Sequence, residues 1–109
     1  MKHIKVSDAA TGLALESAWG AMPLVPSSER TDAERLLEIC AEFWRSDAAA
    51  AAPDAREIAR LVEVLARRSS QAMPFAALGR ALLADMSGDQ GQRGRLLDEF
   101  QIKLSQIGL

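Results

Sequence analysis

Apolar residues recur at intervals of three and four along most of this chain, and that spacing constrains its fold more than any other feature. In residues 31–45 one such row is formed by Leu36, Leu37, Cys40, Phe43 and Trp44, and Ile39 widens it. Residues three, four and seven apart share one face of an α-helix. The preceding TDAE is a capping box, in which the Thr31 hydroxyl binds the amide of Glu34 and the Glu34 side chain reaches back. The sequence therefore predicts a helix that begins at Thr31 and buries Cys40.

Four further segments show the same period and predict four more helices. The first three begin at Ser7 or Asp8, at Asp54 and at Phe75, and the segment from Phe75 ends at Ser87-Gly88. The last has an apolar row that runs from Leu97 to the C-terminus. Asp54 precedes its segment as a helix N-cap, with Glu57 three residues further on. The apolar positions are Leu13, Trp19 and Met22, then Ile58, Leu61, Val62 and Leu65, then Leu78, Leu82 and Met86, and finally Leu97, Phe100, Leu104 and Ile107.

The segments between these helices are short. PLVPSSER, residues 23–30, has two prolines and two serines and predicts a loop. Ala48–Ala52 fit either an extension of the second helix or a linker that Pro53 ends. A chain of 109 residues, 5% aromatic and without tyrosine, suits one domain with an Ala- and Leu-rich core. We therefore expect an all-α compact bundle of about five helices, a single domain over 1–109, in which 1–6 form a flexible N-terminus.

Charge and composition narrow the classes of partner and compartment. The net charge of −2 argues against sequence-independent DNA binding, which draws its affinity from neutralised phosphates. No apolar run approaches the roughly 20 residues of a membrane span, and no apolar region follows the N-terminal lysines as in a secretory signal. The single cysteine needs no oxidising compartment. The sequence predicts a cytoplasmic protein that does not bind membranes.

Residues suited to catalysis or metal binding are few. Cys40 lies between Glu38 and Glu42, whose negative charges disfavour a reactive thiolate, and the one histidine, His3, is near the N-terminus. One histidine and one cysteine leave a zinc site short of ligands. No phosphate-binding glycine loop and no nucleophile–histidine–acid set is found. We therefore predict that the protein is not an enzyme and that it uses no cofactor and no metal.

Charged rows on the second and third predicted helices suggest a binding surface. Glu34, Glu38 and Glu42 are spaced by four and share one helix face. One interpretation pairs them with a basic row on the third helix, formed by Arg56, Arg60 and Arg67. The other, which we favour for function, is that the acidic row meets a basic partner protein.

The first helix and the segment after it carry apolar residues whose role is open. Trp19 and Met22, with Leu24 and Val25, form an apolar stretch flanked by prolines. This stretch either covers the core or protrudes as a contact, since Trp and Met are enriched at interfaces. With the acidic row, Trp19 and Met22 complete the predicted protein-binding residues.

A helix-turn-helix over residues 75–104 is the alternative interpretation. Two predicted helices there flank a short turn with glycine, which is the arrangement of that motif. Its recognition helix would begin with Gln90, Gln92, Arg93 and Arg95, side chains suited to adenine and guanine edges. Acidic residues on both sides of these positions, such as Asp89 and Asp98, oppose this interpretation.

Residues 4–16, IKVSDAATGLALE, resemble the opening of the NinX-like small phage proteins, which begin with a lysine-valine-serine stretch, then Thr-Gly, then Ala-Leu and an acidic residue. The spacing before Thr11 is one residue longer here, and nothing after Gly20 matches. The resemblance implies a phage or mobile-element origin and transfers no functional residue. The matching residues are Val6, Ser7, Thr11, Gly12, Ala14, Leu15 and Glu16.

Taken together, these features predict a small bacterial or phage adaptor that binds another protein. Immunity or anti-defence proteins, secretion chaperones and subunits that complete an assembly belong to this class. The helix with Leu97 and Phe100 either belongs to the core or docks on a partner, including a second copy in a homodimer. A DNA-binding regulator that uses residues 75–104 is the alternative.

Overall fold

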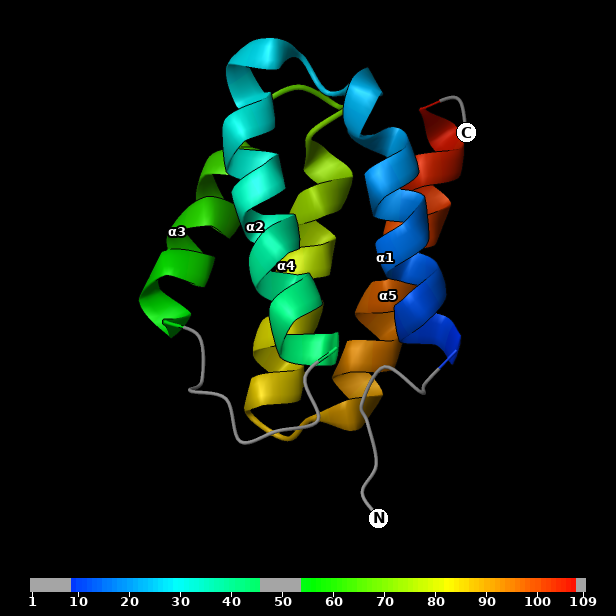
Figure 1. Ribbon diagram of the computed structural model, residues 1–109. Helices are drawn as coiled ribbons and strands as arrows, with labels where there is room; N and C mark the ends of the chain where they lie inside the picture. Colours follow the sequence, from blue (N-terminus) through cyan, green and yellow to red (C-terminus); the bar gives the residue numbers. More distant parts are fainter. Residues whose placement is uncertain (1–8, 46–53, 108–109) are drawn as a thin grey trace.

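The computed structural model describes residues 9–45 and 54–107, and all of its regular structure there is helical (Figure 1). This confirms the predicted all-α bundle of about five helices. Residues 1–6, the cap candidates Ser7 and Asp8, and Ala48–Ala52, on which three of the expectations rest, lie outside the described residues. The elements are α1 (Ala9–Ala21), the short 3-10 helix η2 (Met22–Leu24), α2 (Ser27–Arg45), α3 (Ala55–Ala66), α4 (Met73–Met86) and α5 (Gln90–Gln106).

Helix α4 forms the centre of the bundle. It contacts α2, α3 and α5, whereas α1 packs on α2 and α5. In Figure 1, α1 and α2 lie in front of α5 and α4, with α3 at the left. From Pro74 to Leu82 every residue of α4 except Arg80 is buried. One cluster of buried apolar side chains includes residues of all five helices, so the described helices share a single core.

Local signals set several helix ends as expected. Asp54 caps α3 by accepting a hydrogen bond from the amide of Arg56 at 2.9 Å. Asp89 caps α5 in the same way, with the amide of Gln92 at 3.0 Å. Between α4 and α5, Gly88 has φ of 86°, a left-handed conformation that glycine adopts without steric cost. The predicted start at Asp54 and the predicted stop at Ser87-Gly88 are confirmed.

The start of α2 differs from the prediction. The helix begins at Ser27, one turn before Thr31, so Thr31 is an interior residue and not a cap. Residues 23–30 are accordingly not all loop, since they contain most of η2 and the first turn of α2. The guanidinium of Arg30 donates to the carbonyl of Val25 at 2.8 Å, which satisfies the backbone of the preceding turn. This contact from inside the helix stabilises a start that the capping box does not indicate.

The buried face of α1 also differs from the expected one. Leu13 is 58% exposed and Trp19 is 40% exposed, so the predicted stripe of large apolar residues does not face the core. The helix instead buries small residues and one leucine. These positions recur at intervals of three and four and so share one helix face, which Leu13 and Trp19 do not share. The buried positions are Thr11, Ala14, Leu15, Ala18 and Ala21.

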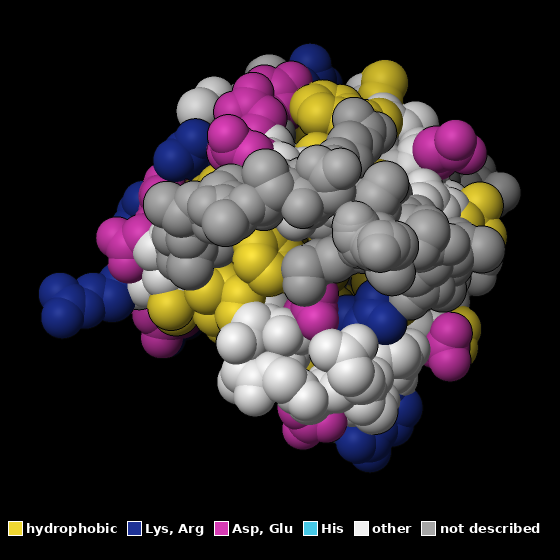
Figure 2. Space-filling view, turned by 60° about the horizontal axis from the view of Figure 1, so that its bottom comes forward, with side chains coloured by type: hydrophobic (Ala, Val, Ile, Leu, Met, Phe, Trp, Pro, Cys, Tyr) yellow, Lys and Arg dark blue, Asp and Glu magenta, His cyan; other side chains and the backbone are white. Residues whose placement is uncertain are grey.

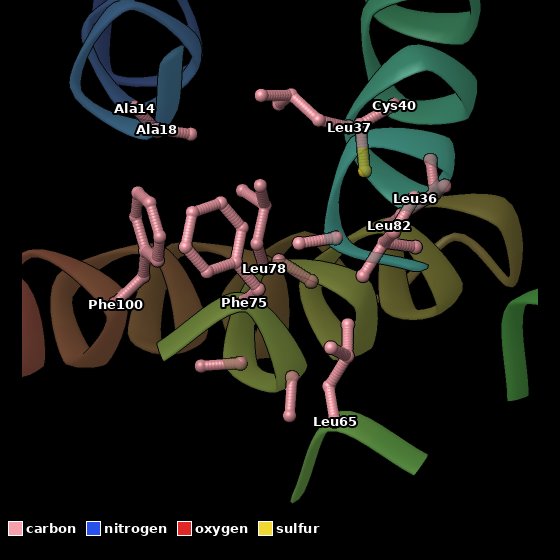
Figure 3. Packing of buried hydrophobic residues seen from close by; sticks show 14 of the residues in the cluster. Ala14, Ala18, Leu36, Leu37, Cys40, Leu65, Phe75, Leu78, Leu82 and Phe100 are labelled. Atoms are coloured by element: carbon pink, nitrogen blue, oxygen red, sulfur yellow. The ribbon is translucent and has the colours of Figure 1, made fainter. Parts of the chain in front are cut away.

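The core combines aromatic residues of α2, α4 and α5 with leucines. Phe75 and Phe100 meet edge to face, with ring centroids 6.0 Å apart. Cys40 is fully buried, and Figure 3 shows its sulfur directed from α2 toward α4. The prediction that Cys40 belongs to the buried side of its helix is therefore confirmed. Phe100 is buried as well, so the apolar row of α5 belongs to the core of this chain.

Candidate protein-binding surface

Trp19 is the large aromatic residue that the fold leaves exposed on α1. The Ser17 hydroxyl accepts a hydrogen bond from Gln101 of α5 at 3.4 Å, so that side of α1 faces α5. Trp19 is two residues further on, about 200° around the helix from Ser17. With 40% of its surface exposed, Trp19 lies outside the buried face of α1.

Met22 is only 5% exposed, which corrects the expectation that it protrudes beside Trp19. The chain turns through η2 after Ala21, and the amide of Val25 donates to the carbonyl of Met22 at 3.0 Å. This turn directs both Met22 and Val25 into the core and leaves Leu24 42% exposed. Leu24 is thus the exposed apolar side chain of this segment.

The acidic ridge, as we call Glu34, Glu38 and Glu42, runs along the outer face of α2. Glu38 and Glu42 are exposed and Glu34 is half-buried. None of the three carboxylates forms a hydrogen bond or an ion pair within the described residues. Figure 2 shows acidic side chains gathered at the upper left of the molecule, with hydrophobic side chains next to them.

Within the described helices, the acidic ridge does not pair with the basic row of α3. Instead, α2 and α3 are joined by an ion pair whose arginine is on α2 and whose glutamate is on α3. Arg35 of α2 donates to both carboxylate oxygens of Glu57 of α3, at 2.8 and 3.1 Å. This bidentate contact raises the pKa of Arg35 and lowers the pKa of Glu57. The charges of Glu38 and Glu42 raise the pKa of Arg35 further, as smaller causes. Arg67 pairs with Glu63 of its own helix at 3.3 Å.

The four residues of the alternative DNA-binding interpretation lie on the first turns of α5, where they bond to one another or to the fold. Gln90 donates to Asp85 at 2.8 Å, and Arg95 donates to Gln92 at 2.5 Å. Arg93 donates to the hydroxyl of Thr11, a buried residue of α1, at 2.6 Å. In Figure 1, α4 and α5 run side by side in opposite directions, with α1 along α5. Arg93 therefore ties α1 to α5, a contact between residues 82 positions apart.

Cys40 shows no sign of activation as a nucleophile. Burial raises the pKa of its thiol well above the usual range, so the thiolate is strongly disfavoured. Among the described residues no three His, Cys, Asp or Glu side chains gather closely enough to hold a metal ion. Within the same residues no helix has both the length and the apolar content to cross a bilayer.

The structure also brings together basic residues that the sequence leaves apart. Arg80 is the exposed residue within the buried stretch of α4, and it lies beside Arg56 and Arg60 of α3 along a shallow groove. The sequence indicates the two arginines of α3 as part of a basic row. A single arginine amid the apolar residues 73–84 is the signal for Arg80, but its neighbours follow only from the packing of α3 on α4.

Comparison of the chain with family models, with curated proteins and with solved structures finds no match. The resemblance of residues 4–16 to NinX-like phage proteins stays a prediction, and residues 4–8 of that stretch lie outside the described residues.

Proposed function

We propose that this protein is a non-enzymatic module that binds another protein through the acidic ridge of α2 together with Trp19 of α1. The exposure of Trp19 is the observation that carries the proposal. A tryptophan that is 40% exposed on a helix leaves much apolar surface in water, whereas Trp44 of the same chain is completely buried. Tryptophan is also among the residues that contribute most to binding energy at protein interfaces.

The acidic ridge adds charge recognition to this apolar contact. Carboxylates four residues apart on one helix repel one another. Arg35 attracts Glu38 and Glu42 at longer range, but no described cation forms a direct ion pair with the ridge. Lysine or arginine side chains of a partner would relieve that repulsion and speed association. The partner surface is therefore basic, with an apolar pocket for the indole.

Three kinds of protein have this mode of action: an immunity or anti-defence protein, a secretion chaperone, and a subunit that completes an assembly. Each acts as an adaptor by covering a surface of another protein. A second copy of the chain is the other partner to consider. The apolar row of α5 is not available for such a homodimer, because Leu97, Phe100 and Leu104 are buried in the core of the same chain.

Capture from a lysate of the source cells, with and without nuclease, separates this function from DNA binding. The tagged chain and a variant with Glu34, Glu38 and Glu42 changed to glutamine are compared by mass spectrometry. We expect one protein to be recovered by the unchanged chain in both samples and to be depleted in the variant. Recovery that disappears with nuclease would contradict the proposal and favour the regulator that uses residues 75–104. Arg95→Ala, on the exposed side of α5, would then be the variant to test on DNA.

A further inference from the structure

A second surface, distinct from the acidic ridge, lies between α3 and α4. An open groove of about 590 Å³ runs there, with Arg56 and Arg60 on the α3 side and Arg80 on the α4 side. Its apolar lining comes from Ala59, Leu83 and Val62, of which Val62 is only 8% exposed. In Figure 2, Lys and Arg side chains project from the left edge of the molecule, the side on which α3 lies in Figure 1.

The three arginines of the groove differ from five other arginines of the described residues. No hydrogen bond or ion pair within the described residues engages the guanidinium group of Arg56, Arg60 or Arg80. By contrast, five arginines donate to carbonyl, carboxylate, amide or hydroxyl oxygens of the fold. These are Arg30, Arg35, Arg67, Arg93 and Arg95.

The one acidic residue that lines the groove is already paired with another arginine. Glu63 forms its ion pair with Arg67, at 3.3 Å. Three guanidinium groups thus surround a small apolar surface. A ligand that fits must bring carboxylates for the arginines and an apolar group for Val62 and Leu83.

We propose that this groove binds an acidic amphipathic helix of a partner protein. Arg56 and Arg60 are four residues apart on α3, which separates them by about 6 Å along the helix axis. Glutamates four residues apart on a partner helix have the same separation. Each guanidinium presents donors in a fork that matches a carboxylate, so the contacts can be bidentate. Leucines on the adjacent face of the partner helix then cover Val62 and Leu83.

A helix with alternating acidic and apolar positions fits the groove better than a nucleic acid does. The apolar lining gives no contact to a phosphate backbone, whereas leucines of a partner helix can cover it. The groove lies on α3 and α4, whereas the acidic ridge and Trp19 lie on α2 and α1. Either surface can therefore fail its test while the other passes.

Binding of a fluorescein-labelled helical peptide to the full chain tests the proposal. The peptide carries glutamates at four-residue intervals with leucines on the neighbouring face, and a matched peptide has glutamine in place of each glutamate. We expect the acidic peptide to bind more tightly than the glutamine peptide. Arg60→Gln together with Arg80→Gln should raise the Kd about ten-fold or more, because charge-assisted hydrogen bonds are lost. Arg68→Gln, an exposed arginine outside the groove, should leave the Kd unchanged.

Charge reversal keeps the test independent of any loss of folding. The variant with R60E and R80E should lose the acidic peptide and gain affinity for a version of the peptide with lysine in place of glutamate. Three results would overturn the proposal. They are an equal Kd for the glutamate and glutamine peptides, a Kd that R60Q and R80Q leave unchanged, and no binding at millimolar peptide. Tighter binding of a duplex DNA than of the acidic peptide, lost in the same variant, would overturn it in favour of a phosphate backbone.

Discussion

The indole Nε1 of Trp44 donates a hydrogen bond to the Asp85 carboxylate at 2.7 Å, which joins the last turn of α2 to the last turn of α4. Trp44 is fully buried, so this bond satisfies a polar group that has no access to water. The second oxygen of Asp85 accepts from the side chain of Gln90 at 2.8 Å. Asp85 therefore connects three helices at one end of the bundle.

Asp85→Ala should lower the free energy of unfolding by about 1–3 kcal/mol, because it leaves the buried indole N–H without an acceptor. Urea denaturation followed by circular dichroism measures this change. Asp98→Ala removes an exposed carboxylate from α5 and serves as the control, with a change within about 0.5 kcal/mol. Equal effects of the two substitutions would show that the Trp44 contact does not stabilise the fold.

Gly79 of α4 allows close packing of α3 and α2, because a Cβ there would clash with Cγ2 of Val62 and lie 3.0 Å from Cδ2 of Leu36. Val62 has little rotamer freedom in a helix and cannot move aside easily. Gly79→Ala should therefore cost about 1 kcal/mol net, with overpacking exceeding the gain in helix propensity.

Gly94→Ala is the matched control, since no atom lies within 4 Å of a Cβ at that position of α5. It should stabilise the fold by about 0.5–1 kcal/mol through helix propensity alone. Urea midpoints of the two variants should therefore move in opposite directions. A stabilising Gly79→Ala would mean that α3 and α4 are not packed closely at this site.

Phe100 tests whether α5 belongs to the core or is a separate docking element. Phe100→Ala removes a ring that packs edge to face on Phe75 and should cost about 3–5 kcal/mol. Ile102→Ala, at a position 58% exposed on the same helix, should change stability by about 0.5 kcal/mol or less. Thermal denaturation compares the two variants. A Phe100→Ala variant with unchanged stability would indicate that α5 does not pack on α4.

Cys40 should make stability depend on pH in the alkaline range. Burial raises the pKa of its thiol in the folded state, whereas the thiol of the unfolded chain ionises near about 8.5. The unfolded state thus loses the proton first as pH rises. The contribution of this thiol to the free energy of unfolding is therefore constant below that pH. Above it, the free energy of unfolding decreases by about 1.4 kcal/mol per pH unit.

The measurement compares unfolding free energies at pH 7 to 10 for the unchanged chain and for Cys40→Ala, whose profile lacks this decrease. Alkylation with iodoacetamide provides a second readout. Cys40 should react only in denaturant, and rapid reaction of the native protein would show that the thiol is accessible.

The sequence predicts those parts of the fold that depend on local signals. The four-residue spacing of Ile58 and Val62, the cap at Asp54 and the stop at Gly88 each act within one turn of the chain, and the structure confirms them. The start of α2 was predicted wrongly, since the helix begins one turn earlier, at Ser27, and Arg30 of that turn bonds to the carbonyl of Val25. The face of α1 was predicted wrongly because its large apolar residues do not share the spacing of Ala14, Leu15 and Ala18, which face the core.

The sequence does not predict those features of the candidate surfaces that depend on contacts between residues far apart in the chain. Arg93 on Thr11 and Trp44 on Asp85 join residues of different helices, and no spacing pattern indicates either pair. The burial of Met22 depends on the η2 turn, which the prolines indicate only as a loop. Arg80 and Arg60 line the same groove because α4 packs on α3. The groove therefore follows from tertiary packing and not from a sequence pattern.

Retention of the captured partner by two matched double variants tests the proposed function most directly. One variant combines Trp19→Ala with Glu38→Gln, and the other combines Ile102→Ala with Asp98→Asn, an exposed apolar and an exposed acidic residue of α5. We predict that the first raises the Kd for the partner about ten-fold or more while the second leaves it unchanged. Equal retention by both variants would contradict binding through Trp19 and the acidic ridge.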